Sequence, residues 1–205
     1  MNNALLVDLG GTNMRYAIVK DVDEDLSEIN KLPFNQDNFD SFIEKIIDNQ
    51  KINILIISIA GPKIDNSISM TNIDFSFDAD AIKKKFKLDD CILLNDWVAI
   101  AYSYPYISNS INFIKEGTKF NNIKLFIGPG TGLGASLLID NNIVLPTEVG
   151  NTTNSSLSLQ KNYNVNLEDH ITLESLVSGS AISSIYKSLV NKDISSEEIL
   201  SLIHI

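Results

Sequence analysis

The feature that most constrains the fold is a pattern of apolar strand, glycine turn and apolar strand, which occurs twice in the chain. The first copy, ALLVDLGGTNMRYAIVK, covers residues 4–20, and the second, KLFIGPGTGLGASLLID, covers residues 124–140. Both turns contain Gly-Thr, at positions 11–12 and 130–131. Because an array of small repeats needs more than two copies, the pattern predicts one glycine hairpin in each of two lobes.

The rest of the first half alternates between strand-like and helix-like segments. Apolar residues spaced three and four apart predict helices over 37–48 and 78–86, and a third helix is expected from Asp96 to near Pro105. Runs rich in Ile, Leu and Val predict further strands at 53–60, 67–71 and 91–95. Two adjacent strands followed by strands that alternate with helices indicate an α/β fold with a mixed sheet flanked by helices.

A polar segment rich in turn residues, 106–122, separates the two glycine hairpins. We therefore expect a first lobe over residues 1–107 and a second lobe over residues 108–205. In the second lobe, apolar periodicity predicts a helix around 171–190, and a capping box that begins at Ser195 predicts another helix after it. Each lobe would then hold one hairpin and its own helices.

Composition narrows the classes of partner. A formal net charge of −10 argues against binding nucleic-acid or lipid phosphates over a broad surface. No apolar stretch reaches the roughly 18 residues of a membrane span, and MNNALLVD lacks the basic start of a signal peptide. The single cysteine, Cys91, cannot form an internal disulfide, and we interpret it as a buried core thiol. We therefore expect a cytoplasmic protein with no nucleic-acid or membrane partner.

The two glycine turns suit the binding of phosphate groups. Glycine has no Cβ, so backbone N–H groups of the turn can approach a phosphate closely. One Gly-Gly-Thr turn alone is usually an ordinary hairpin, whereas two turns, the first preceded by Asp8 at a strand end, indicate a nucleotide and its Mg²⁺ ion. Neither turn matches the Walker or the dinucleotide-binding pattern, since Gly-Lys-Ser/Thr is absent and a strand follows each turn.

The segment CILLNDWVAIA, residues 91–101, offers a second group of polar side chains. Asn95 and Asp96 follow a predicted buried strand at its carboxyl end, where open α/β sheets bind ligands. Asp96 has two interpretations: it caps the next helix, or it accepts a proton from a substrate hydroxyl during phosphoryl transfer. The residues alone leave both interpretations open.

Five motifs follow one another along the chain: VDLGGTNMR, AGPKIDNSISMTN, LLNDW, GPGTGLG and LPTEVGN. In this order and spacing they resemble the bacterial glucokinase family, a member of the superfamily of sugar kinases, actin and heat-shock chaperones. The resemblance runs from the N-terminus to about Gly179, and it implies the two-lobed, ribonuclease-H-like fold of actin-like ATPases. Because family members continue well beyond this length, it also implies an incomplete second lobe and weak ATP binding by this chain alone.

The resemblance implies a role for each matching residue. The first phosphate loop comprises Asp8, Gly10, Gly11, Thr12 and Asn13, with Asp8 holding Mg²⁺ through water. The second phosphate loop comprises Gly130, Thr131 and Gly132. The sugar is bound by Asn72, Asn95, Asp96, Glu148, Asn151 and Glu174, of which Asp96 is the catalytic base toward the 6-hydroxyl. Carboxylates and amides suit this task because they pair sugar hydroxyls by charge-assisted and bidentate hydrogen bonds.

One motif departs from the family pattern. In LPTEVGN, Thr147 and Val149 replace two glycines, and Asn151 replaces a histidine. Threonine and valine adopt positive φ poorly, so we expect the backbone at Glu148 to be displaced. Asn151 can still donate and accept hydrogen bonds, but it cannot take a positive charge.

The leading hypothesis is therefore a cytoplasmic, ATP-dependent and Mg²⁺-dependent glucokinase that phosphorylates glucose at the entry to glycolysis. The oligomeric state stays open between a monomer and a homodimer, although dimers are common among similar enzymes. The second hypothesis is a truncated, non-catalytic sugar-binding or regulatory protein, which the altered glutamate motif favours.

Overall fold

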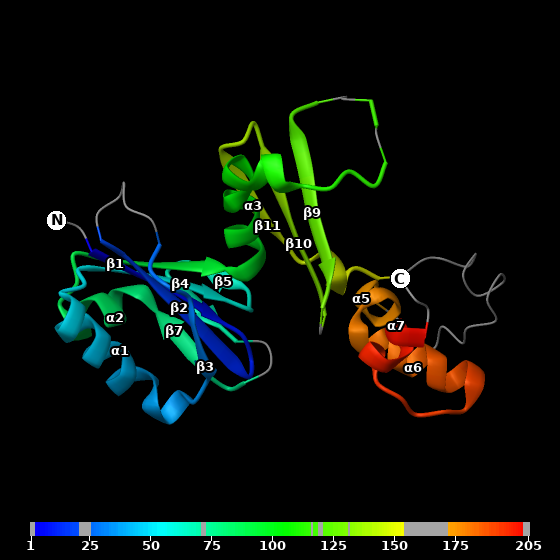
Figure 1. The fold of residues 1–205 in the computed structure, drawn as a ribbon, viewed down its shortest axis with the longest axis horizontal. Coiled ribbons are helices and arrows are strands. Elements are labelled where there is room, and N and C mark those ends of the chain that lie inside the picture. Colours follow the sequence, from blue (N-terminus) through cyan, green and yellow to red (C-terminus); the bar gives the residue numbers. More distant parts are fainter. Residues whose placement is uncertain are drawn as a thin grey trace. The chain divides into compact units, whose positions relative to one another are not determined.

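The structure is a computed structural model that describes residues 3–20, 26–70, 73–115, 117–118, 121–130, 132–153 and 172–202. The chain divides into two compact units, Met1–Ile100 and Ala101–Ile205, which can be followed in Figure 1. The division falls inside helix α3 (Asp96–Ile107). The lobe assignment made from the sequence stays a prediction. No helix in the described ranges combines the length and the apolar character of a membrane span.

A five-stranded mixed sheet forms the centre of the first unit. Its strands lie in the order β3–β2–β1–β4–β8. Their bounds are β1 (Asn3–Leu9), β2 (Asn13–Lys20), β3 (Asn30–Pro33), β4 (Ile54–Ile59) and β8 (Asp90–Asn95). Strands β1, β4 and β8 run parallel, whereas β2 is antiparallel to both of its neighbours. The four longer strands confirm the sequence predictions, while β3, with the sequence NKLP, lacks the apolar run that would have predicted it.

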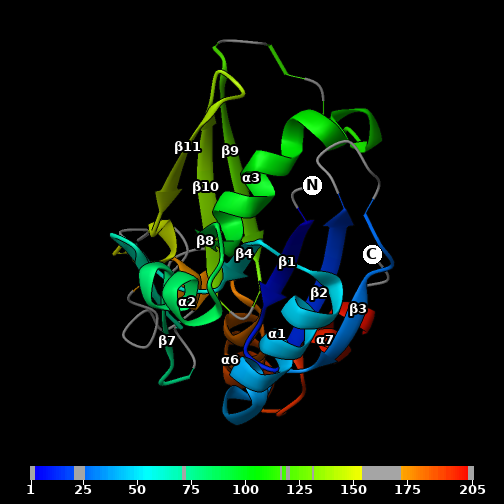
Figure 2. The same ribbon diagram turned by 90° about the vertical axis from the view of Figure 1, so that its left-hand side faces the viewer.

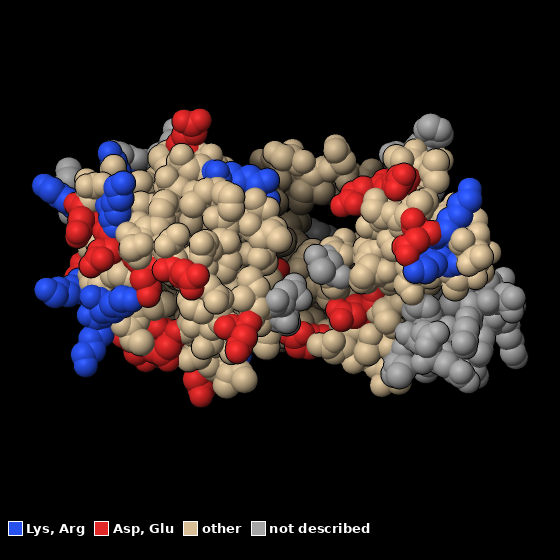
Figure 3. Space-filling view, turned by 90° about the horizontal axis from the view of Figure 1, so that it is seen from below, with Lys and Arg blue, Asp and Glu red and all other residues tan. Residues whose placement is uncertain are grey.

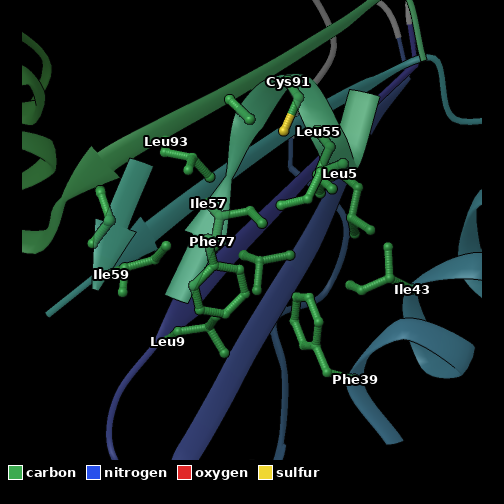
Figure 4. Packing of buried hydrophobic residues seen from close by; sticks show 14 of the residues in the cluster. Leu5, Leu9, Phe39, Ile43, Leu55, Ile57, Ile59, Phe77, Cys91 and Leu93 are labelled. Carbon is green, nitrogen blue, oxygen red and sulfur yellow. The ribbon is translucent and has the colours of Figure 1, made fainter. Parts of the chain in front are cut away.

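The core of the first unit lies between this sheet and helix α1 (Gln36–Gln50). In Figure 2, α1 crosses one face of β1 and β2. Alternate residues of β1, such as Leu5 and Leu9, point to this face and are buried. Figure 4 shows Phe39 and Ile43 of α1 pointing toward the sheet. The spacing of three and four residues that predicted this helix is thus the spacing of its buried face.

A small sheet and helix α2 (Ala79–Phe86) complete the first unit. The small sheet has the order β5–β6–β7, with bounds β5 (Lys63–Ile64), β6 (Ser67–Ser69) and β7 (Ser76–Asp78). Asp78 caps α2, because its Oδ1 accepts a hydrogen bond from Ala81 N at 2.8 Å. The helix predicted over 78–86 is confirmed, and the strand predicted at 67–71 corresponds to the shorter β6.

The second unit contains an antiparallel sheet in the order β11–β10–β9. Its strands are β9 (Ile123–Pro129), β10 (Leu133–Ile139) and β11 (Ile143–Thr147), and the helices after them are α5 (Glu174–Val177), α6 (Gly179–Val190) and α7 (Ser196–Leu202). Helix α6 confirms the helix predicted around 171–190. Ser195 Oγ accepts a hydrogen bond from Glu198 N at 3.2 Å, as the predicted capping box requires.

Helix α3 corrects one prediction. The sequence predicts an end near Pro105, whereas the helix runs to Ile107 and a 3₁₀ turn follows over Ser108–Ser110. Proline lacks only its own N–H, and residues after it in the last turn can still donate to earlier carbonyls. Tyr104 also packs edge-on against Phe126 of β9, with ring centroids 5.6 Å apart, which stabilises this end of the helix.

Charged side chains of both signs share the surface. On the face drawn in Figure 3, Asp and Glu occur over both units, and Lys and Arg are interleaved with them. A run of three lysines lies on α2, and Lys85 Nζ is 2.5 Å from Asp40 Oδ2 on α1. This basic segment therefore faces acidic neighbours rather than forming a broad basic surface.

Candidate functional site

The first glycine turn closes the hairpin of β1 and β2. Gly10 N donates a hydrogen bond to the carbonyl of Asn13 at 2.9 Å, and Asn13 Nδ2 donates to Thr12 Oγ1 at 3.0 Å. None of the described glycines has a positive φ, so the turn does not need glycine for a left-handed backbone. Gly11 is exposed, and without a Cβ its backbone is accessible to a ligand.

Asp8 precedes this turn and forms an ion pair across the hairpin. Its Oδ2 accepts a hydrogen bond from Arg15 Nη1 at 2.9 Å, and both side chains are half exposed. Mg²⁺ prefers oxygen ligands, keeps several waters and often binds through one or two carboxylates plus substrate phosphates. A half-exposed carboxylate beside an exposed glycine turn fits such a site. The described residues contain no group of three or more His, Cys, Asp or Glu side chains that could hold a metal by themselves.

The sheet brings Asp8 to the same edge as Asn95 and Asp96. Asp8 is in register with Ser58 of β4, and Leu94 of β8 is in register with the same Ser58. Asn95 and Asp96 therefore lie just beyond this level on the second strand away, about 10 Å across the sheet by the usual strand spacing. Asp8 lies near the carboxyl end of β1, and Asn95 and Asp96 lie at the carboxyl end of β8. Open α/β sheets bind ligands at this edge.

Both ends of the Asn95 side-chain amide form hydrogen bonds, one end with the start of α3 and the other with Gly61. Its Oδ1 accepts hydrogen bonds from Trp97 N at 3.0 Å and from Val98 N at 3.3 Å, which is the role of a helix N-cap. Its Nδ2 donates to the carbonyl of Gly61 at 3.0 Å. The interpretation of Asp96 as the helix cap is therefore wrong, because Asn95 is the cap and Asp96 is the first helical residue.

Asp96 is partly buried at the N-terminal end of α3. Its Oδ1 accepts a hydrogen bond from Trp97 N at 3.0 Å. The partial positive charge at the start of a helix stabilises a carboxylate at this position. A carboxylate in this position can accept a proton from a hydroxyl that lies within hydrogen-bond distance.

Gly61 is a structurally important neighbour that the sequence analysis missed. A Cβ at this position would overlap the carbonyl oxygen of Ser69, so the connection from β4 to β5 can pass β6 only because Gly61 has no side chain. The same glycine supplies the carbonyl that Asn95 binds. The local signal is a glycine between an apolar strand and Pro62, which marks a turn but does not identify its partners.

The second glycine turn lies between β9 and β10. Gly130 N donates to the carbonyl of Gly132 at 2.8 Å, and the carbonyl of Gly130 accepts from Gly179 N, at the start of α6, at 2.8 Å. A Cβ on Gly130 would meet nothing within 4 Å among the described residues. The turn is thus fixed by α6 and open at Gly130. Thr131, predicted to bind phosphate, and Asn72, predicted to bind the sugar, lie outside the described residues.

Three predicted sugar-binding residues lie beside this turn. Glu174 Oε2 accepts a hydrogen bond from Leu133 N at 3.2 Å. Asn151 Nδ2 donates to Glu148 Oε2 at 3.3 Å, and both of these side chains are exposed. Gly150 links the two pairs, since a Cβ there would lie 3.2 Å from Glu174 Oε2. The fold of the second unit therefore gathers the two glutamates and Asn151 next to the second glycine turn.

The backbone of the altered glutamate motif avoids positive φ. Glu148 has φ −109° and ψ 43°, and neither Thr147 nor Val149 has a positive φ. Thr147 ends β11, where its Oγ1 donates to the carbonyl of Ala135 at 3.2 Å. The backbone here therefore has a form that threonine and valine tolerate, and the displacement of Glu148 expected from the replacement of two glycines stays a prediction.

The first unit also has two hollows. One, of about 340 Å³, borders Asp8 and Arg15 but is lined mainly by aliphatic side chains, such as Leu6 and Ile56, on the outer face of the sheet. The other, of about 490 Å³, is bordered by the small sheet and by Asp65. A hexose needs several paired polar groups, so the aliphatic hollow does not suit it.

The chain is similar in sequence to a known protein family and to several of its members. The sequence model of the family described as Glucokinase matches residues 5–204. The glucokinase of Campylobacter jejuni subsp. doylei is 31% identical over 204 residues, which cover 92% of this chain and 61% of that protein. The bifunctional protein glk of Paraburkholderia xenovorans is 30% identical over 202 residues, which cover 92% of this chain and 32% of that protein. The chain thus spans 61% of the length of one curated relative and 32% of the other.

A solved structure supports the fold. The glucokinase from an Antarctic psychrotroph has a TM-score of 0.73 and 27% sequence identity, and the match covers 100% of this chain and 71% of that chain. The predicted fold class, an α/β fold with mixed sheets flanked by helices, is confirmed by this likeness and by the sheets described above.

Proposed function

Because the chain belongs to the glucokinase family, we propose that it is a hexose kinase that transfers the γ-phosphoryl group of ATP to the 6-hydroxyl of glucose. The observation that carries the proposal is the shared sheet edge of Asp8 and Asp96, with an open glycine turn directly after Asp8. The products are ADP and glucose 6-phosphate. Both substrates are cytoplasmic metabolites, so the proposed reaction belongs in the cytoplasm, at the entry to glycolysis.

Asp96 is the proposed general base. Its carboxylate accepts the proton of the 6-hydroxyl while that oxygen bonds to the γ-phosphorus. The bond from the γ-phosphorus to the β–γ bridging oxygen breaks, and its electron pair leaves with ADP. Asn95 positions the base, because it caps α3 and is itself bound to the carbonyl of Gly61.

The two glycine turns are the proposed phosphate-binding elements. The first is formed by residues 10–13 and the second by residues 130–132. Backbone N–H groups in such turns bind phosphate oxygens without needing a charged side chain. Asp8 is the residue that would hold Mg²⁺ through water, and the bound ion supplies charge neutralisation on the phosphates.

The proposed sugar-binding residues are polar side chains of complementary kinds: Asn72, Asn95, Asp96, Glu148, Asn151 and Glu174. The carboxylates accept hydrogen bonds from hydroxyls, and the amides both donate and accept. A site that pairs each hydroxyl discriminates against sugars that lack one, because its own polar groups are then left unpaired. The proposal therefore includes selection among hexoses by hydrogen bonding.

The substitution Asp96→Asn tests the proposed base. Asparagine keeps the size of the side chain but cannot accept the proton, so turnover of glucose should fall by at least about 100-fold. Glucose binding, measured by calorimetry, should persist. The control Asp48→Asn makes the same charge change at an exposed position on α1 and should keep wild-type turnover. Wild-type turnover in the Asp96→Asn variant would show that Asp96 is not the base.

A non-catalytic sugar-binding or regulatory protein is the second candidate. The changes at Thr147, Val149 and Asn151 favour it, because sugar binding can persist in a relative that has lost phosphoryl transfer. Calorimetry with glucose and with Mg–ATP separates the candidates. Glucose binding without nucleotide binding supports the second candidate, whereas glucose phosphorylation coupled to ADP formation rejects it.

A further inference from the structure

Glu174 contacts two different loops of the second unit through a single oxygen. Its Oε2 accepts a hydrogen bond from Leu133 N, directly after the glycine turn, at 3.2 Å. A Cβ built on Gly132 of that turn would lie 2.7 Å from the same oxygen. A Cβ built on Gly150, in the loop that carries Glu148, would lie 3.2 Å from it. One carboxylate oxygen therefore packs against both loops.

The two glycines leave space for this carboxylate. Neither Gly132 nor Gly150 has a positive φ, so backbone conformation does not explain why a side chain is absent at either position. At Gly150 a Cβ would also lie 2.7 Å from the carbonyl oxygen of Leu133. By contrast, a Cβ on Gly130, in the same turn, would meet nothing within 4 Å among the described residues. The close approach thus occurs at the glycines that face Glu174.

The segment that carries Glu174 is itself held in place. Ser175 N donates to Thr172 Oγ1 at 3.3 Å, and Thr172 N donates to Ser175 Oγ at 3.2 Å, which is a reciprocal pair of the capping-box kind. A few residues later, Gly179 N donates to the carbonyl of Gly130 at 2.8 Å. The glycine turn is therefore attached to the α5–α6 segment at two points, and Glu174 supplies one of them.

We infer that Glu174 is a positioning residue that joins the second phosphate loop to the loop of Glu148 and Asn151. This inference rests on the proposed function, which makes the first loop a nucleotide-binding element and the second a sugar-binding element. Loss of the carboxylate then lowers two affinities. One is the affinity for nucleotide when no sugar is present, and the other is the affinity for sugar when no nucleotide is present. A residue that only contacted the sugar would change sugar binding alone.

The variant Glu174→Gln tests whether Glu174 joins the two loops. Glutamine keeps the length of the side chain but loses the charge that strengthens the bond to Leu133 N. Calorimetry of the full chain with Mg–ADP alone and with glucose alone should each show an affinity about three- to tenfold lower. The control Glu197→Gln makes the same charge change at an exposed position of α7 and should leave both affinities unchanged. Loss of glucose affinity alone, or of neither affinity, would overturn the inference.

A second measurement is independent of the proposed function. In ¹H–¹⁵N NMR spectra of the full chain without ligand, Glu174→Gln should shift the amide resonances of both Leu133 and Gly150 relative to wild type, because the carboxylate packs against both loops. Glu197→Gln should shift neither resonance, and Glu174→Asp, which shortens the side chain, serves the same comparison if Glu174→Gln does not fold. A wild-type chain that bound neither substrate would reject the proposed function, while these spectra would still test whether Glu174 joins the two loops. A shift of Leu133 without Gly150 would overturn the inference.

Discussion

The side-chain amide of Asn95 lies 3.0 Å from the carbonyl oxygen of Gly61, and this hydrogen bond joins the end of β8 to the connection after β4. The other end of the same amide caps α3, the helix that begins with Asp96. Gly61 in turn is held against the carbonyl of Ser69, where a side chain would not fit. The orientation of the proposed base therefore depends on Asn95 and, through it, on the close contact of Gly61 with Ser69.

Asn95→Ala removes both of these interactions. Loss of an N-cap costs about 1 kcal/mol, and loss of a further hydrogen bond costs about 1 kcal/mol more. We expect urea denaturation, followed by circular dichroism, to show a free energy of unfolding lower by about 2 kcal/mol. Asn95→Asp should lose less, because aspartate caps a helix but cannot donate to Gly61. Equal losses in the two variants would contradict a separate role for Nδ2.

Gly61→Ala should be strongly destabilising. Its methyl group would overlap the Ser69 carbonyl, so the backbone of one strand connection must move. Overpacking of this kind costs about 1–3 kcal/mol, and more where backbone is the neighbour. The control Gly117→Ala places a methyl group where no atom of the described residues lies within 4 Å, and it should change stability by less than about 0.5 kcal/mol. A Gly61→Ala variant as stable as the control would show that the close approach to Ser69 does not constrain the fold.

Most elements around the site could be predicted from the sequence because their signals are local. Apolar runs rich in Ile, Leu and Val give β1 and β4, and apolar residues three and four apart give α1. Strand β11 was not predicted, and Pro146 within it weakens the strand signal because proline cannot donate to a sheet. Local patterning therefore explains both the successes and this omission.

The contacts that organise the site could not be predicted, because each joins distant parts of the chain. The Asn95 and Gly61 pair is separated by 34 residues, and the Glu174 and Leu133 pair by 41 residues. A polar residue at a strand end indicates that a partner is needed, but many carbonyls and N–H groups could serve. Only the folded topology selects one. For the same reason the sequence offered only Asp96 as a candidate for the helix cap, whereas the structure assigns this role to Asn95.

Cys91 should make stability fall at alkaline pH. Burial, and next the negative charge of Asp90, raise the pKa of the Cys91 thiol from 9.0 to about 11. The folded chain then keeps its thiol proton at pH values where the unfolded chain loses it. The contribution is complete below the unfolded pKa and is lost as the pH rises from about 9 to about 11. Urea midpoints measured across this range should decline less steeply for Cys91→Ala, and equal declines would contradict the assignment.

Asp78 should give a pH dependence of the opposite sign. Its hydrogen bond from Ala81 N, and next that from Ser67 Oγ, lower the pKa of the Asp78 carboxyl below 3.8. Its contribution to stability is therefore complete above the unfolded pKa and is lost as the pH falls through the lower, folded pKa. Asp78→Asn can still cap α2 but cannot ionise. Urea midpoints of this variant should change less than wild-type midpoints below about pH 4, and parallel curves would count against the carboxylate.

Gly130→Ala separates what the fold requires from what a ligand requires. A methyl group here would meet no atom of the described residues within 4 Å, so the free energy of unfolding should stay within about 0.5 kcal/mol of wild type. If phosphates approach the backbone of this turn as we propose, the methyl group stands in their way. Calorimetry should then show ATP affinity lower by about tenfold, equivalent to about 1.4 kcal/mol. Gly117→Ala should bind ATP like wild type, and a Gly130→Ala variant that did the same would exclude phosphate binding at Gly130.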